Sequence, residues 1–268
     1  MPREVRDSLY WIQECGADRS NFVEETSDPN PVWYNEDEEL HIGQCAYLFT
    51  DDQTLLFDTL SPASSDRIIA VLDELLAGDD LDYLAVSHPD VPHAGNTARI
   101  LREYPEATLV APKYGTGHEL YHLDDAMHVG EGDTIDLGTN TVAFHEATFL
   151  DAALHMWMTE TTTNTLFPVD WFGYPHTNSE CGLFADEFDH AITPDRLMHF
   201  HGRVLFWYQY VDVEKVNAEI DQLIESYDPD LLAPAHGNVV RENVSDHMRL
   251  MKQVVQDINQ DGRVGALG

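Results

Sequence analysis

The chain has 268 residues, of which 43% are hydrophobic, so it can bury a sizeable core and is not expected to be disordered. Its 49 Asp and Glu residues outnumber 14 Lys and Arg residues and give a formal net charge of −35. This charge excludes nucleic acid and anionic membranes as partners, because binding a phosphate surface requires clustered Lys and Arg.

The acidic residues are spread along the whole chain and do not form an acidic tail. They repel one another at ordinary ionic strength, whereas at molar salt the Debye length falls to about 3 Å and the repulsion is screened. The charge therefore indicates adaptation to a salt-rich cytoplasm and carries no information about the reaction.

Three cysteines, Cys15, Cys45 and Cys181, form an odd-numbered set without CxxC spacing. This pattern favours neither a disulfide framework nor a thiolate zinc site, and it fits a reducing compartment. The first ten residues, MPREVRDSLY, contain no apolar signal core, and no run approaches 18 apolar residues. A cytoplasmic protein that does not span a membrane is expected.

The first half of the chain alternates strand and helix patterns. The runs CAYLFT and TLLFDT, on either side of Asp51, Asp52 and Gln53, predict an antiparallel hairpin. Residues 65–77 show helical spacing, with Ser65 to cap the helix and Gly78 to end it. Further elements are predicted as a strand at 81–87, a helix at about 95–104, a strand at 108–112, a hairpin region around Gly130, Gly132 and Gly138, and a strand at 141–148.

The second half continues the mixture of strands and helices. The predicted elements are a strand ending in LFPVD, helices at about 193–200 and 212–226, the strand LLAPAH and a C-terminal helix to about 260. Without internal repeats or a Gly/Ser linker, residues 1–268 are expected to form one domain. Two sheets packed face to face with helices outside are the expected architecture.

Four strand ends carry an acidic or imidazole side chain directly after the apolar run. They are LAVSHPDVPH, the ATFLD that follows TVAFHE, LFPVD and LLAPAHG. Side chains at the ends of different strands can converge on one point, which is how rigid sheets assemble sites from distant sequence. The pattern therefore predicts a metal site.

The order of these motifs resembles the metallo-β-lactamase superfamily, and most of all the di-iron branch of flavodiiron proteins. HPDVPHAG is similar to that branch's H-x-E-x-D-H motif, LFPVDWFG to its L-F-S-N-D-A-F-G segment and LLAPAHG to its I-A-P-S-H-G segment. HIGQCAYLFTDDQTLLFDT resembles its opening hairpin, so the likeness covers nearly the whole chain. It implies a four-layer αββα metallo-β-lactamase-like sandwich.

The resemblance also implies a dinuclear metal site, in which Asp170 and His93 would take part in the reaction. The implied ligands are His88, Asp90 and Asp151 for the first metal, His93 and His236 for the second, and Asp170 as the bridge. His145, Glu146, His155 and His176 have no ligand role in the family pattern and are expected to be structural or surface residues, although His155 could supply a missing nitrogen.

Two positions depart from the family motif. Pro92 stands where the family has an aspartate, and Asp151 stands where it has a histidine. Proline removes a donor from the second metal, and a carboxylate in place of an imidazole favours iron or manganese over zinc. Iron is therefore the expected metal, with zinc or manganese as alternatives.

Three functions follow from the resemblance. The first is binding or reduction of O2 or NO at a modified dinuclear iron site. The second is metal-dependent hydrolysis of an ester, thioester, lactone or phosphodiester. The third is a non-catalytic fold whose metal site has lapsed.

The expected partners follow from the same reading. The ligand would be a small molecule or a gas, and no flavodoxin domain or FMN site is expected in this chain, so reduction would need a separate electron donor. The aromatic stretch 201–212 is expected to serve either as core or lid or as an interface of a homo-oligomer, a dimer or larger.

Overall fold

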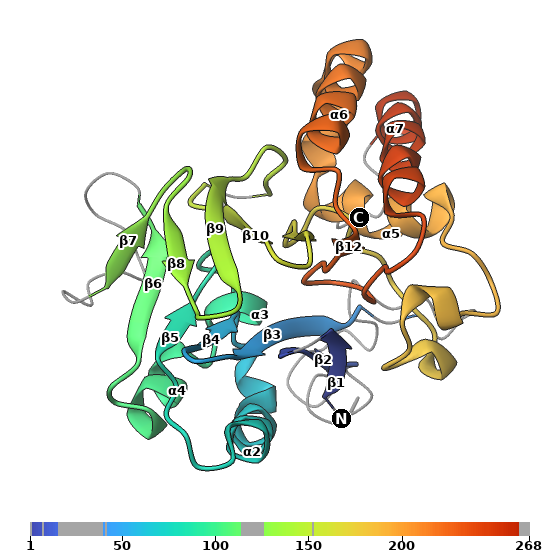
Figure 1. The fold of residues 1–268 in the computed structure, drawn as a ribbon. Coiled ribbons are helices and arrows are strands. Elements are labelled where there is room, and N and C mark those ends of the chain that lie inside the picture. The colour runs from blue at the N-terminus through green and yellow to red at the C-terminus, as the bar shows by residue number, and fades with distance from the viewer. Residues whose placement is uncertain are drawn as a thin grey trace. The chain divides into compact units, whose positions relative to one another are not determined.

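The computed structural model describes residues 2–6, 8–15, 40, 42–113, 126–151 and 153–262 (Figure 1). Its contacts divide the chain into two compact units. The first comprises Met1–Glu14, Gln44–Thr148 and Ala152–Thr163, and the second comprises Cys15–Gly43, Phe149–Asp151 and Asn164–Gly268. The single domain expected for residues 1–268 stays a prediction.

The first unit contains a mixed sheet in the order β1-β2-β3-β4-β5-β6-β7. Neighbouring strands are antiparallel from β1 to β4 and parallel from β4 to β7. The predicted hairpin is confirmed, because β3 and β4 pair with Tyr47 opposite Phe57. The strands are β1 (Arg3–Arg6), β2 (Leu9–Glu14), β3 (Gln44–Thr50), β4 (Thr54–Phe57), β5 (Tyr83–Ala85), β6 (Thr108–Pro112) and β7 (Met127–Val129).

Helices cover the apolar side of this sheet. Helix α2 (Ser65–Leu76) buries Ile68 and Leu72 in a core that includes Leu48, Leu56 and Leu84 from three strands. The predicted end of this helix at residue 77 is one residue late, because Ala77 adopts a left-handed conformation with φ of 54°. The other helical elements are η1 (Pro62–Ser64), α3 (Val91–Ala94) and α4 (Thr97–Glu103).

A second set of strands in the first unit is antiparallel throughout. It consists of β8 (Thr134–Asp136), β9 (Thr141–Glu146) and β10 (Met156–Glu160). The Asp51 carboxylate accepts hydrogen bonds from the backbone and the side-chain amide of Asn140, at 2.7 and 2.8 Å. These bonds tie the β3–β4 turn to the β8–β9 turn.

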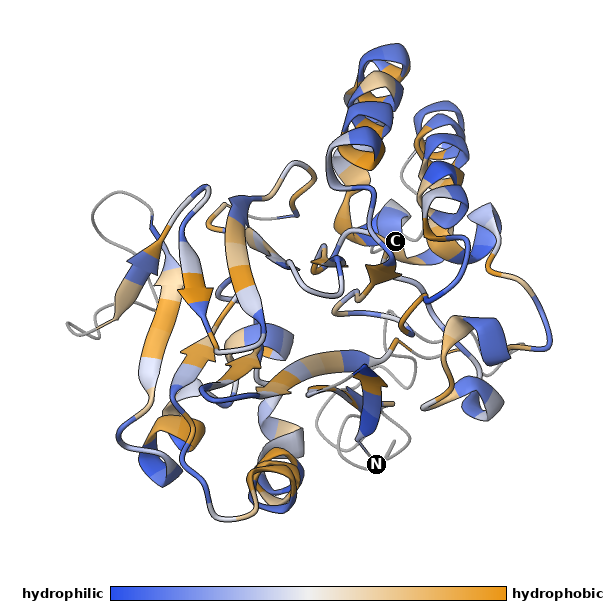
Figure 2. Ribbon diagram, viewed as in Figure 1, coloured by the Kyte–Doolittle hydropathy of each residue, from blue (hydrophilic) through white to orange (hydrophobic). Residues whose placement is uncertain are grey.

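The second unit contains a parallel strand pair and three longer helices. The helix α7 buries Met248, Met251 and Val255, and its Asn259 side chain donates to the carbonyls of Tyr208 and Val211. Figure 2 shows polar and apolar residues alternating around α6 and α7, as expected for helices with one buried face. The elements are β11 (Thr165–Phe167), η2 (Asn178–Glu180), η3 (Ala185–Glu187), α5 (Pro194–Val204), η4 (Phe206–Tyr210), α6 (Val213–Tyr227), β12 (Leu231–Leu232) and α7 (Val244–Asp261).

The fold class expected from the sequence is confirmed at the level of a mixed α/β protein with two sheets and helices. The predicted helix at 193–200 extends four residues further, to Val204. Among the described residues, no helix is both long and apolar enough to cross a membrane.

A substitution of Gly95, the glycine of the HPDVPHAG motif, tests how tightly the first unit is packed. A Cβ atom there would lie 2.6 Å from the Val91 carbonyl oxygen and 2.6 Å from Cδ of Pro62. Gly95→Ala should therefore lower the free energy of unfolding by about 1–3 kcal/mol, because backbone atoms must move. Gly130→Ala is the matched control, since its nearest neighbour would lie 3.8 Å away. Equal urea midpoints for the two variants would contradict this packing.

Candidate metal centre

The six predicted ligands divide evenly between the two units. His88, Asp90 and His93 belong to the first unit, and the second unit contains the other three, which are Asp151, Asp170 and His236.

The loop that follows β5 places His88 and His93 in the interior of the first unit. Both imidazoles are buried, whereas the Asp90 side chain is 58% exposed, with an oxygen 3.9 Å from Nε2 of His88. The short helix α3 begins at Val91 and has Pro92 in its first turn. Proline fits there because the first-turn N–H groups have no partner within a helix. Pro92, which stands where the family motif has an aspartate, therefore suits the local backbone.

Asp58 orients His93. Its Oδ2 lies 2.7 Å from Nδ1 of His93, and both side chains are buried. The same carboxylate accepts hydrogen bonds from the backbone N–H and the hydroxyl of Ser87, at 2.9 and 3.0 Å. A carboxylate at Nδ1 holds a proton there and leaves Nε2 as the lone-pair donor, an arrangement typical of metal-bound histidine.

Asp58 is a candidate site residue that is absent from the set predicted from the sequence. It follows the apolar strand β4 in the run TLLFDT, which is the same strand-end signal that identified the predicted ligands. Its backbone φ is 64°, a conformation that costs energy for a residue other than glycine. Strain of this kind is frequent at functional sites.

His155 joins the two motif histidines in the first unit. Its ring stacks on that of His88, with centroids 4.3 Å apart and planes 12° from parallel, and the His88 and His93 centroids are 4.0 Å apart. His155 is 7% exposed and precedes β10. Three gathered imidazoles supply the nitrogen donors that transition metals bind. His155 therefore fits a ligand role better than the surface or structural role expected from the sequence.

In the second unit, Asp170 and His236 face each other. The Oδ1 atom of Asp170 lies 3.1 Å from Nε2 of His236, and Nδ1 of His236 donates to the carbonyl of Gly43 at 2.9 Å. Because Nδ1 carries the proton, a neutral His236 turns its Nε2 lone pair toward a carboxylate oxygen. Two such acceptors at this distance require a proton or a cation between them. The donor chemistry therefore fits a metal ion.

The backbone around Asp170 is held by His201. The N–H of Phe172 donates to Nε2 of His201, at 3.1 Å, and Nδ1 of His201 donates to the Leu197 carbonyl at 2.9 Å. Complete burial lowers the pKa of His201 to about 4, although the Leu197 carbonyl and the Asp170 charge favour protonation. A neutral His201 thus accepts the bond that positions Phe172, which has a φ of 70°.

Asp151 lies on a segment that is fixed by the aromatic stretch. A carboxylate oxygen of Asp151 lies within 4.8 Å of a carboxylate oxygen of Asp170. The indole N–H of Trp207 donates to the Leu150 carbonyl at 3.0 Å. Tyr208 in the same stretch is buried, whereas Tyr210 is 79% exposed. The stretch 201–212 therefore serves partly as core, and its role in an interface stays a prediction.

The described residues form a metallo-β-lactamase-like α/β fold with groups of His and Asp side chains that are able to bind a metal. A family profile described as "ODP family beta lactamase" matches residues 42–237. The chain belongs to this family.

Known relatives agree with this assignment. The chain is 27% identical over 253 residues to a nitric oxide reductase from Moorella thermoacetica, covering 90% of this chain and 58% of the relative. It is 26% identical over 250 residues to an anaerobic nitric oxide reductase flavorubredoxin from Vibrio vulnificus, covering 91% of this chain and 47% of the relative. The chain thus spans about half the length of these relatives.

A solved structure shows the same fold. The flavodiiron protein from Giardia intestinalis matches 96% of this chain and 59% of its own, with a TM-score of 0.72 and 18% identity. This likeness supports the predicted resemblance to flavodiiron proteins at the level of the fold.

The low pKa of His201 gives a pH-dependent stability. The folded pKa of about 4 lies below the unfolded value of 6.5, so the unfolded chain takes up a proton first as the pH falls. The stability that the folded protein gains from a neutral His201 is present above pH 6.5 and is lost as the pH falls from there toward 4. Between pH 7.5 and 5 the loss should be about 2 kcal/mol.

Urea midpoints of the wild type and of His201→Gln, measured across that range, test this linkage. We expect the variant to be less stable at pH 7.5 but to lose less stability on acidification, because glutamine does not titrate. Parallel pH profiles for the two proteins would show that His201 is not kept neutral by burial.

Proposed function

We propose that this protein is a non-haem iron protein that binds or reduces dioxygen or nitric oxide. The proposed ligands are His88, Asp90, His93, Asp151, Asp170 and His236, with His155 as an added nitrogen donor. Iron held by these residues would supply a place for a diatomic gas to bind and would pass on electrons from a donor for its reduction. The relatives named as nitric oxide reductases support the choice of gas.

The observation that carries this proposal is the orientation of two histidines by partners at Nδ1. His93 is held by the buried Asp58 carboxylate, and His236 by the Gly43 carbonyl. In both cases Nε2 is left to act as a ligand, which is the usual arrangement of a metal-bound histidine. Asp170 adds the carboxylate that the family resemblance assigns as a bridge.

The protein's own residues have roles that do not depend on the gas. His201 and the strained backbone at Val169 and Phe172 hold Asp170 in place. Asp170 is buried, and so is its neighbour Trp171, whose ring stacks on that of Phe149 with centroids 5.5 Å apart. Exclusion of water strengthens the binding of charge by these ligands.

A metal-dependent hydrolase is the second candidate. The observation in its favour is the close approach of the buried imidazoles of His88 and His155, because zinc in hydrolases prefers imidazole ligands. Both candidates require bound metal, and they differ in which metal the purified protein retains and in whether ferrous protein binds nitric oxide.

Metal content tests the ligand assignment. Protein loaded with ferrous iron without oxygen should retain iron after desalting, and nitric oxide should add a visible absorption band. Asp170→Asn and His93→Ala should each lose most of the iron, whereas His190→Ala, which alters an exposed histidine, should retain it. Asp58→Asn should bind iron about 10- to 100-fold more weakly while leaving the ligands intact.

Three outcomes separate the candidates. Retained iron with a nitric oxide band supports the gas-binding function. Retained zinc with hydrolysis of a thioester or lactone, abolished by chelation, would replace it with the hydrolase. A folded wild type that holds no more metal than Asp170→Asn would contradict both.

We also infer that the iron receives electrons from a donor and that the chain works as a homo-oligomer in a salt-rich cytoplasm. Tyr210 and Phe206, 79% and 39% exposed, are the apolar side chains that such an interface could cover.

The net charge of −35 makes the effect of salt measurable. Raising KCl from 0.1 to 1 M shortens the Debye length from about 10 to about 3 Å and should raise the thermal midpoint by roughly 5–10 °C. An equal rise with sucrose at the same osmolality would indicate general exclusion from the surface and not charge screening.

A further inference from the structure

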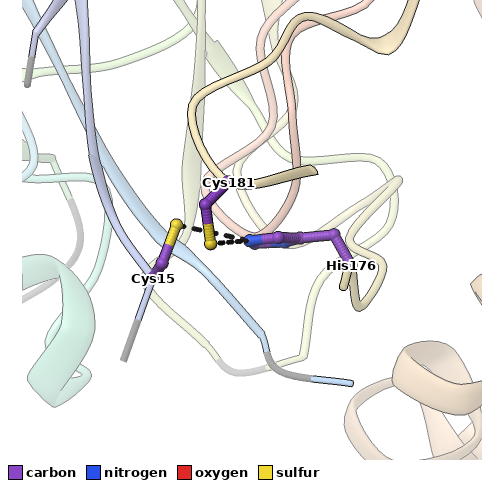
Figure 3. Close-up of side chains that lie close together, drawn as sticks. All are labelled: Cys15, His176 and Cys181. Carbon is purple, nitrogen blue, oxygen red and sulfur yellow. Dashed lines mark hydrogen bonds between the residues drawn. The ribbon is translucent and has the colours of Figure 1, made fainter. Parts of the chain in front are cut away.

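A second group of metal-ligating side chains lies wholly within the second unit. Cys15 follows β2, His176 lies beyond the LFPVDWFG motif, and Cys181 directly follows η2. The Sγ atoms of Cys15 and Cys181 are 3.4 and 3.5 Å from Nε2 of the same imidazole (Figure 3). All three donor atoms lie within 4.8 Å of one another.

These distances match a tetrahedral metal site. Zinc binds thiolate sulfur at about 2.3 Å and imidazole nitrogen at about 2.0–2.1 Å. In a tetrahedron with those bond lengths, sulfur and nitrogen are about 3.6 Å apart and two sulfurs about 3.8 Å apart. Both measured sulfur–nitrogen separations fall within about 0.2 Å of that edge.

Both contacts lie at hydrogen-bond distance from the same ring nitrogen, an arrangement that two ordinary hydrogen bonds fit poorly. An imidazole nitrogen has either one lone pair or one N–H, so Nε2 of His176 can make one well-directed hydrogen bond to a single thiol. Figure 3 shows the two sulfurs on the same side of the ring, both directed at this nitrogen. A shared cation satisfies all three donors at once.

The turn that carries Cys181 is held by neighbouring side chains. Glu180 accepts from the backbone N–H of Thr177 at 2.8 Å and from the guanidinium of Arg196 at 3.0 Å. The buried Asn238 side chain donates to the carbonyls of Glu180 and Leu183, each at 2.7 Å. The turn is therefore fixed before any ion binds, as a specific metal site requires.

The donor types select the ion. Thiolates favour zinc over the hard ions that carboxylates prefer, and two cysteines with one histidine leave a fourth position for water or another ligand. His176 is fully buried, and both cysteines are partly exposed, which gives the ion access from solvent. None of the three cysteines forms a disulfide in the described residues.

We propose that Cys15, His176 and Cys181 bind one Zn²⁺ ion, which joins residue 15 to the 176–181 segment. Binding releases the two thiol protons to solvent and involves no change of oxidation state. These residues are separate from the proposed iron ligands, so this proposal does not rest on the proposed function.

Cobalt provides the direct test. Co²⁺ added to the reduced, full-length protein should give a thiolate-to-cobalt absorption band, which one equivalent of Zn²⁺ removes. Cys15→Ser and Cys181→Ser should each weaken Zn²⁺ binding by more than about 100-fold, since even losing a partner of a ligand costs about 10- to 100-fold. Cys45→Ala is the matched control and should keep the band, as Cys45 lies outside the cluster. A band that persists in Cys15→Ser, or no band in the wild type, would overturn the proposal.

Two further measurements keep the test independent of folding and of the iron site. In the wild type, Zn²⁺ should protect Cys15 and Cys181 from alkylation, and chelation should restore their reactivity. If a reductant and not a chelator restores it, the two cysteines form a disulfide and the zinc proposal fails. Asp170→Asn should keep the cobalt band, so failure of the proposed iron site would leave this result unchanged.

Discussion

The buried hydrogen bond between Asp58 and His93 fixes the imidazole of a predicted ligand in the interior of the first unit. Asp58 stands at the end of β4 with a positive φ, its N–H bonds to the Ala85 carbonyl of β5, and its carboxylate also binds Ser87. One side chain thus connects two strand ends to the helix that carries His93. The energy spent on this backbone and on burying a carboxylate is offset by its three hydrogen bonds, and the result is an imidazole fixed in both orientation and tautomer.

The second unit uses the same principle with neutral groups. The Gly43 carbonyl fixes the tautomer of His236, and the buried, neutral His201 fixes the backbone beyond Asp170. The Asp170 carboxylate and the His236 imidazole then lie 3.1 Å apart. Two acceptor atoms at this distance need a proton or a cation between them. In a protein with so many surface carboxylates, a cation held by these residues also relieves local negative charge.

Local patterns in the sequence predicted much of the fold and the strand-end residues, because hydrophobic periodicity and strand ends are short-range signals. Asp58 also follows an apolar strand, but the run that contains it predicts only a hairpin. The sequence does not reveal that His155 lies near His88, because this proximity depends on contacts between distant segments. These contacts are the pairing of β10 with β9 and the hydrogen bond from the Met156 N–H to the Ser87 carbonyl. The Cys15 and His176 pair, 161 residues apart, has no local spacing that could reveal it. The sequence alone therefore does not indicate a thiolate zinc site.

We propose that the oriented Nε2 atom of His93 in the first unit and that of His236 in the second unit each bind iron. Crystals of the iron-loaded protein, measured on both sides of the iron absorption edge, give the most direct test. We predict an iron-edge anomalous peak at bonding distance from Nε2 of His93 and one at bonding distance from Nε2 of His236, the latter with an oxygen of Asp170 beside it. A folded, iron-saturated protein whose only anomalous peaks lie away from these histidines would contradict the claim.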